Sequence, residues 1–155
     1  MKAYFVIVWL FLICCKPAMA QSNDRTKSFN LKNFSLAIQG YDPVAYFTKN
    51  QAVEGTKSYA LTYKGITYYF STLQHKELFE ASPAQYEPQY GGWCAYAMGA
   101  NGEKVLVDPK TFKMVNGKLY LFYNRLFNNT LDSWNKNEKT LQATADRNWE
   151  KHFKP

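Results

Sequence analysis

The apolar residues of this chain gather in short runs separated by turn residues, and the stretch from Tyr59 to Cys94 organises the rest. Its first two runs, Tyr59–Tyr63 and Ile66–Phe70, are rich in Tyr, Thr and Phe, which suit a pleated, half-buried surface. Lys64-Gly65 stands between them, and glycine tolerates the positive φ that a tight reversal requires. The pattern therefore predicts an antiparallel hairpin.

A helix is predicted directly after this hairpin. Ser71 or Thr72 can cap its first turn, because a side-chain oxygen there accepts a hydrogen bond from a free backbone N–H. The helix is expected to end at Ser82, since a residue followed by proline avoids the helical region. Its predicted apolar stripe consists of Leu73, Leu78, Phe79 and Ala81.

The strongest hairpin signal comes later in the chain. Phe112–Val115 and Lys118–Tyr123 flank Asn116-Gly117, and Asn-Gly favours the type I′ turn. Beyond this hairpin the spacing of apolar residues predicts two helices that pack on the sheet. The first is expected to contain Leu126, Leu131 and Trp134, and the second Leu141, Ala145, Trp149 and Phe153.

Residues 1–20 have the pattern of a signal peptide. Lys2 supplies a positive start, Ala3–Cys15 an apolar core, and Ala18-Met19-Ala20 the small-x-small pattern that predicts cleavage before Gln21. The apolar run is too short for a comfortable transmembrane helix. Lipoprotein processing at either leader cysteine is disfavoured, because neither follows a small residue. We expect an exported bacterial protein, periplasmic or secreted, with no integral membrane segment after cleavage.

The remaining chain has the length of one domain. Hydrophobic residues make up 46% and aromatic residues 17% of the sequence, which is enough to build a core and argues against disorder. We expect the polar residues 21–33 to form a flexible lead-in. Residues 34–155 are expected to form a small single α+β domain with antiparallel β-hairpins and packed helices.

Cleavage of the leader changes the charge and the cysteine count. Removing Lys2 and Lys16 lowers Lys+Arg from 19 to 17 against 12 Asp+Glu, so the net charge falls from +7 to about +5. The positive charge is scattered, which argues against a nucleic-acid partner. Cys94 becomes the only cysteine, and a single cysteine in an exported chain indicates a reactive thiol, a metal ligand or intermolecular pairing.

Several motifs together resemble the YHS domain family, over about residues 41–123. They are Asp42-Pro43-Val44, Gly65-x-x-Tyr68-Tyr69-Phe70-Ser71, Phe79 and Pro83-x-x-Tyr86. GGWCAYA and the later GKLYLFYN resemble more narrowly the exported branch called YHS domain-containing (seleno)proteins. Some members of that branch carry selenocysteine, and the resemblance places it at Cys94. Because selenocysteine is mostly used for redox or soft-metal chemistry, the resemblance favours a functional Cys94.

The resemblance also directs attention to His75. Metal-binding YHS modules carry cysteines at three positions that here hold Ala45, Ser71 and His75, and only His75 is a good ligand for a soft metal. Asp42 either accepts a hydrogen bond from His75 or caps a turn. His152 is expected to be structural, and the tyrosines at 41, 46, 68, 90 and 96 either line a pocket or pack in the core.

Three hypotheses of function follow, and an enzyme is the less favoured class. The first is a module that binds copper or zinc through Cys94, His75 and Asp42, with copper(I) favoured because zinc usually needs three or four protein ligands. The second is a single-cysteine redox protein or sensor, which needs an external small thiol to resolve its product. The third is a structural or interaction domain in which Cys94 is merely packed.

Overall fold

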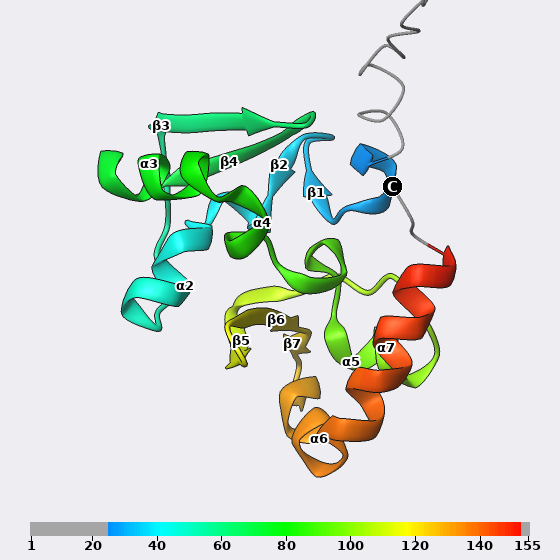
Figure 1. The fold of residues 1–155 in the computed structure, drawn as a ribbon. Coiled ribbons are helices and arrows are strands. Elements are labelled where there is room, and N and C mark those ends of the chain that lie inside the picture. The colour runs from blue at the N-terminus through cyan, green and yellow to red at the C-terminus, as the bar shows by residue number, and fades with distance from the viewer. Residues whose placement is uncertain (1–24, 153–155) are drawn as a thin grey trace, which may run out of the picture.

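The structure is a computed structural model that describes residues 25–152. These residues form one small α+β domain, as the sequence predicted (Figure 1). One sheet has the strand order β1-β2-β4-β3, while β5 pairs with β6 and β7 with β8 in two-stranded sheets. The strands are β1 (Leu31–Lys32), β2 (Leu36–Ala37), β3 (Thr56–Tyr63), β4 (Ile66–Phe70), β5 (Asp108–Val115), β6 (Lys118–Phe122), β7 (Asn124–Arg125) and β8 (Asn128–Asn129).

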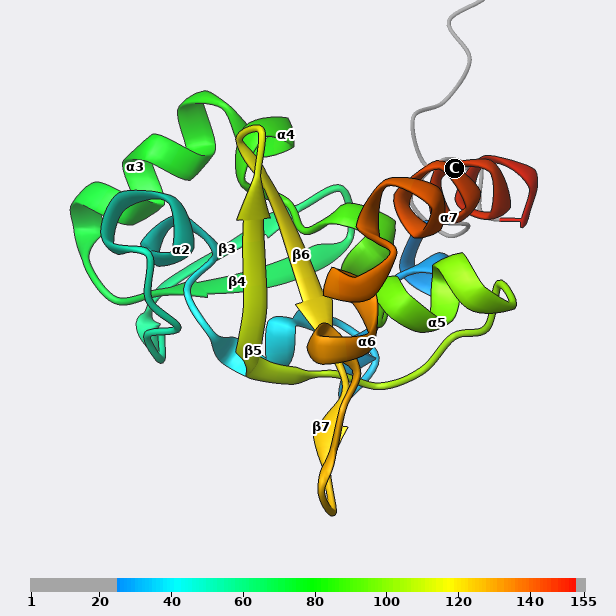
Figure 2. The same cartoon turned by 90° about the horizontal axis from the view of Figure 1, so that it is seen from below.

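Helices cover one side of the four-stranded sheet and form a second layer beside β6 (Figures 1 and 2). One group of helices contacts β3 and β4, and the other group packs beside β6. The helices are α2 (Pro43–Lys49), α3 (Leu73–Ala81), α4 (Pro83–Tyr86), α5 (Ala95–Ala100), α6 (Thr130–Lys136) and α7 (Glu138–His152), with short 3-10 turns η1 (Ile38–Gly40) and η2 (Gln89–Gly92).

Both predicted hairpins are confirmed. β3 pairs antiparallel with β4, and β5 with β6. Their turns place two successive residues at positive φ, Lys64 and Gly65 at 47° and 81°, and Asn116 and Gly117 at 50° and 70°. This is the backbone of a type I′ turn, in which the second residue of each pair is the glycine that tolerates it. Local turn chemistry therefore sets both registers.

The predicted helix after the first hairpin is also present as α3. Thr72 caps it, because its Oγ1 accepts the backbone N–H of His75 at 3.1 Å. The predicted apolar stripe is wrong in part. Phe79 is fully buried, whereas Leu73 and Leu78 are 53% and 36% exposed. The helix is short, and of its residues only His75 and Phe79 are buried, with Phe79 against Phe70 of β4, so its other side chains are more exposed.

The prediction for Leu126 is wrong, because this residue does not belong to a helix. It lies at the tip of the β7–β8 hairpin, and α6 starts only at Thr130. Asn129 caps α6, since its side-chain oxygen accepts the backbone N–H of Leu131 at 3.1 Å. Trp134 is fully buried, as the helical spacing predicted.

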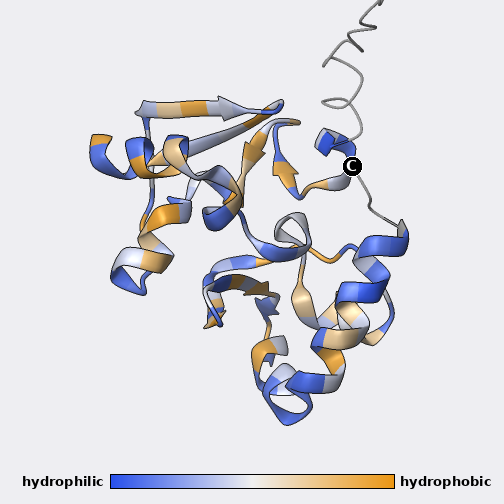
Figure 3. Ribbon diagram, in the orientation of Figure 1, coloured by the Kyte–Doolittle hydropathy of each residue, from blue (hydrophilic) through white to orange (hydrophobic). Residues whose placement is uncertain are grey.

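The last helix packs differently from the prediction. α7 lies mainly against α5 rather than on the sheet, and most of its residues are hydrophilic (Figure 3). Ala145 is fully buried, and Leu141 and Trp149 are partly buried in the same cluster. The Asn148 side chain donates a hydrogen bond to the backbone oxygen of Met98 at 2.8 Å. The layer formed by α5 therefore separates α7 from most of the sheet.

The chain is packed from Arg25 onward, which differs from the flexible lead-in expected up to residue 33. Arg25 is 7% exposed and forms an ion pair with Glu87, and its guanidinium carbon lies 4.6 Å from the centre of the Phe29 ring. The ion pair joins positions 62 residues apart in sequence. The local composition of residues 21–33 therefore could not predict that this segment is packed. The predicted signal peptide and the expected cleavage site lie outside the described residues.

Candidate functional site

Asp42 connects the start of α2 to the start of α3. Its carboxylate is fully buried, and Oδ1 accepts the backbone N–H groups of Val44 at 2.9 Å and Ala45 at 3.3 Å. Oδ2 accepts the Ser71 N–H at 2.8 Å, the Ser71 hydroxyl at 2.6 Å and the Nδ1–H of His75 at 2.6 Å. Asp42 therefore has both roles considered from the sequence: it caps α2 and orients His75.

His75 is held by contacts on both ring nitrogens. With Nδ1–H donated to Asp42, Nε2 lies 3.2 Å from Oγ1 of Thr48. The Thr48 hydroxyl has a second acceptor, the backbone oxygen of Val44 at 3.1 Å, and it donates to one of the two. His75 is 5% exposed, but Thr48 is exposed, so the Nε2 side of the ring lies just below the surface.

Cys94 lies on another element, at the N-cap of α5 directly after η2 and Trp93. The two preceding glycines have φ values of +59° at Gly91 and +83° at Gly92. A Cβ on Gly91 would stand 2.8 Å from the Trp149 ring and 3.1 Å from the Cα of Phe29. Gly91 thus lets α7 and the N-terminal segment approach the backbone, and the positive φ of both residues suits glycine, which accounts for the pair without any ligand.

The thiol of Cys94 is fully buried and closed by two neighbours. Its sulfur accepts the backbone N–H of Tyr123 at 3.4 Å and lies 3.4 Å from the Thr130 hydroxyl. That hydroxyl already donates to the backbone oxygen of Tyr123 at 2.9 Å. The S–H group is therefore the donor to Thr130, which completes a closed ring of hydrogen bonds.

The structure brings Asp42 and His75 together and gives Cys94 other partners. Ala45, Ser71 and His75 all contact Asp42. Neither Asp42 nor His75 is a hydrogen-bond partner of Cys94. Within residues 25–152 no group of three or more His, Cys, Asp or Glu side chains is placed to hold a metal ion.

The tyrosines considered as pocket residues pack in the core instead. Tyr46, Tyr68 and Tyr90 are buried, and each hydroxyl donates to a protein acceptor. Burial raises the pKa of each hydroxyl above its ordinary value, since the charged form would lose its hydration. Tyr41 and Tyr96 are partly buried against the core. The side chain of His152 lies outside the described part.

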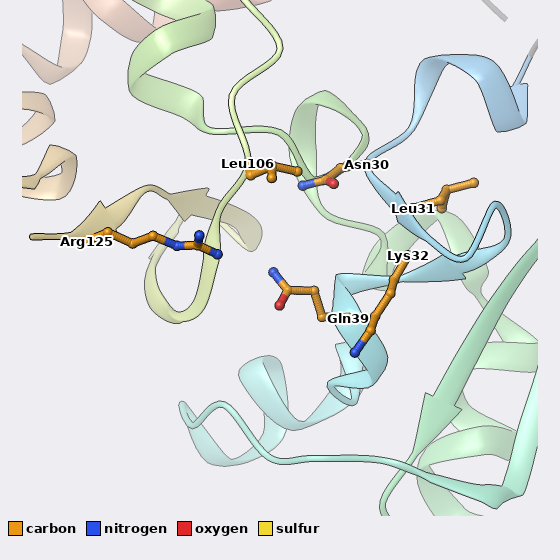
Figure 4. A pocket seen from close by; sticks show the side chains of 6 residues that line it. All are labelled: Asn30, Leu31, Lys32, Gln39, Leu106 and Arg125. Atoms are coloured by element: carbon orange, nitrogen blue, oxygen red, sulfur yellow. The ribbon is translucent and has the colours of Figure 1, made fainter.

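Two small hairpins that were not predicted from the sequence expose large apolar side chains. Phe34 in the β1–β2 turn is 95% exposed, and Leu126 and Phe127 at the β7–β8 tip are 90% and 110% exposed. A pocket of about 240 Å³ lies between these hairpins (Figure 4). The sequence did contain a signal for the second hairpin, because Leu126-Phe127 is an apolar pair inside the otherwise polar run 124–129. Leu126 was assigned to a helix instead, because its spacing from Leu131 and Trp134 suits one.

Comparison of the chain with protein-family models, curated proteins and solved structures gave no match. Among residues 25–152, no helix is both long and apolar enough to cross a membrane.

Proposed function

We propose that this protein is an exported, non-catalytic interaction domain of the YHS type, in which Cys94 is a structural thiol. The observation that carries the proposal is the complete burial of Cys94 together with the hydrogen bonds that engage its sulfur. A sulfur with both a donor and an acceptor already in place needs no external ligand. This supports the packed-cysteine hypothesis over a thiol that turns over substrate.

A redox function requires that an oxidant and a resolving thiol reach the sulfur. Reactive cysteines are usually partly exposed and lie next to a cation or a histidine. Cys94 has zero exposure, and its neighbours in the hydrogen-bond ring are a neutral hydroxyl and a backbone amide. The structure therefore offers less support for the single-cysteine redox hypothesis.

Alkylation of the mature chain tests the proposal. In the native state we expect Cys94 to react with iodoacetamide at least about 100-fold more slowly than a free model thiol, because reaction requires local opening. In denaturant the same thiol should react at the ordinary rate. Fast native alkylation at neutral pH would contradict the proposal and favour the redox hypothesis.

A second cysteine at an exposed position provides the matched control. Leu73 is 53% exposed on α3, so Leu73→Cys should add one thiol that reacts quickly in the folded protein. One fast and one slow thiol in this variant would exclude a general fault of the reagent. Two slow thiols would mean that the slow reaction does not report burial.

Metal binding at His75 is the second candidate function, and the Asp42–His75 pair is the observation that favours it. A carboxylate that accepts from one ring nitrogen is the usual partner of a histidine whose other nitrogen binds a metal. Here the other nitrogen, Nε2, would bind copper or zinc after Thr48 moves aside. Asp42 would orient the ring rather than ligate, since both of its oxygens are engaged.

Elemental analysis and metal titration of the same untagged preparation separate the two candidates. Under the interaction-domain proposal the protein carries no stoichiometric metal, and His75→Ala and Cys94→Ser change nothing in the titration. Stoichiometric copper or zinc that is lost with His75→Ala and kept with Cys94→Ser would establish the His75 site instead. Loss with both variants would establish the shared site expected from the sequence.

A further inference from the structure

The β7–β8 hairpin projects from the body of the molecule (Figure 2). Its two tip residues are Leu126 and Phe127, at 90% and 110% exposure, so both side chains are almost completely exposed to solvent. Exposed leucines are ordinary on protein surfaces, but an adjacent leucine and phenylalanine with no covering contact at a projecting tip are not. The tip therefore presents a compact apolar knob.

The backbone at this tip is strained at both residues that carry the exposed side chains. Leu126 and Phe127 have φ values of 49° and 66°, in the left-handed region. The two other two-residue hairpin turns among residues 25–152, at 64–65 and 116–117, place a glycine second. The β7–β8 turn has the same backbone with neither glycine nor asparagine. This turn has two large apolar residues where asparagine and glycine would be more stable. The energetic cost indicates that the exposed apolar side chains themselves have a function.

Two cations lie at the base of this knob. Arg125 directly precedes the tip, and its guanidinium faces the pocket from one side (Figure 4). Lys32 faces the pocket from the other side and comes from β1, two residues before the exposed Phe34. None of the six residues that line the pocket is acidic. Each of the two hairpins therefore combines a cation in the pocket with an exposed apolar residue just beyond it.

We infer that this surface, formed by Lys32, Phe34, Arg125, Leu126 and Phe127, docks on an anionic phospholipid membrane. The phosphate of a lipid headgroup would be bound between Lys32 and Arg125. Leucine and phenylalanine at the tip would enter the boundary between headgroups and acyl chains, where aromatic and aliphatic side chains are favoured. The positive charge of the mature chain, about +5 (17 Lys+Arg against 12 Asp+Glu), adds attraction to an anionic surface.

A membrane fits this surface better than a protein partner does. Protein interfaces usually pair a groove or flat patch with a complementary surface, whereas here the apolar residues stand on a projecting tip beside a small cationic pocket. Such a shape penetrates a soft interface while its cations remain at the headgroups. The inference rests on the proposed interaction-domain function, because it names the partner of that domain. It does not depend on the role of Cys94.

Flotation of the mature protein with vesicles tests the inference. We expect binding to vesicles of phosphatidylcholine with 30% phosphatidylglycerol, and at least about 10-fold weaker binding to pure phosphatidylcholine, since each cation near an anionic surface contributes attraction. Raising the salt to 0.5 M should weaken the binding, because exposed charges are then screened. Absence of binding to anionic vesicles at millimolar lipid would overturn the inference.

The decisive variant replaces the tip by the pair that suits its backbone, L126N/F127G. It removes the apolar knob and relieves the strain, so the hairpin is expected to remain folded. Vesicle binding should fall at least about 10-fold, because the two apolar side chains that would be buried in the membrane are lost. Unchanged binding would overturn the inference. Leu73→Asn, at an exposed leucine on α3, is the matched control and should bind as the unchanged protein does.

A charge variant tests the pocket separately. K32Q/R125Q should lose the preference for anionic vesicles, whereas K49Q/K57Q, which removes the same charge from exposed positions elsewhere, should keep it. An equal loss of this preference in both variants would mean that only the net charge of the protein matters, and it would overturn the proposed site. If the protein binds a soluble phosphate monoester but no vesicle, the pocket holds a free anion and the membrane inference fails. Cys94 that stays unreactive in that case would leave the proposed function standing.

Discussion

At the scale of single residues, the β7–β8 turn holds backbone angles that its side chains oppose. A left-handed conformation costs roughly 1–2 kcal/mol for a residue with a Cβ, and Leu126 and Phe127 both adopt it. We therefore predict that L126N/F127G raises the free energy of unfolding by about 1 kcal/mol or more, since Asn and Gly suit this turn. Urea denaturation measures the change.

The reciprocal exchange is the control for this prediction. N116L/G117F places the same pair in the β5–β6 turn, where Asn and Gly now occupy positive φ. This variant should lose stability by a similar amount. If the first variant is not stabilised while the second is destabilised, the β7–β8 turn is held by contacts rather than strained, and the functional interpretation of its sequence weakens.

At the scale of elements, the contact between α5 and α7 depends on one glycine. A Cβ on Gly99 would lie 2.5 Å from the backbone oxygen of Leu141, closer than van der Waals contact allows. Helix propensity alone predicts that Gly99→Ala stabilises the protein by up to about 1 kcal/mol. We predict the opposite, a loss of about 1–3 kcal/mol, because the added methyl group must push α7 away. Thermal and urea unfolding decide the sign.

Ala100→Ser provides the comparison on the same helix. Ala100 is exposed, so its substitution should change the free energy of unfolding by less than about 0.5 kcal/mol. A stabilised Gly99→Ala variant would mean that α7 adjusts without cost and that the α5–α7 packing is looser than the structure indicates. Near-ultraviolet circular dichroism of Trp134 and Trp149 would then report any repacking of this layer.

At the scale of the whole molecule, buried tyrosines should make the fold sensitive to alkali. Burial raises the pKa of Tyr120 from its ordinary 10.0 to about 12, and burial also raises the pKa of Tyr46, Tyr68 and Tyr90. Above pH 10 the unfolded chain loses these protons while the folded chain keeps them, so the stability present below pH 10 falls as the pH rises toward 12. Urea midpoints should stay level from pH 8 to about 10 and decline between about pH 10 and 11.

Tyrosinate absorbance near 295 nm supplies the second measurement. For these four side chains it should appear together with the loss of circular dichroism rather than before it. Ionisation of every tyrosine of residues 25–152 in the folded protein near pH 10 would contradict the buried hydrogen bonds of the hydroxyl groups. Exposed tyrosines ionise early in either case, so the fraction that ionises late is the informative quantity.

The sequence by itself determined the features that depend on a few neighbouring residues. The Lys-Gly and Asn-Gly turns, the Thr72 and Asp42 caps and the helix end before Pro83 were all predicted, because each arises from local backbone preferences and short-range hydrogen bonds. The α+β class followed from these elements.

Only the tertiary structure decided which distant side chains meet. It placed Asp42 with Ser71 and His75 and gave Cys94 to Tyr123 and Thr130, contacts that span 29 to 36 residues and leave no local pattern. It also turned Leu126, whose spacing resembled a helix, into the tip of a hairpin, because the chain between β6 and α6 is used to build β7 and β8. Local preference fixes elements, whereas packing and chain connectivity fix their partners.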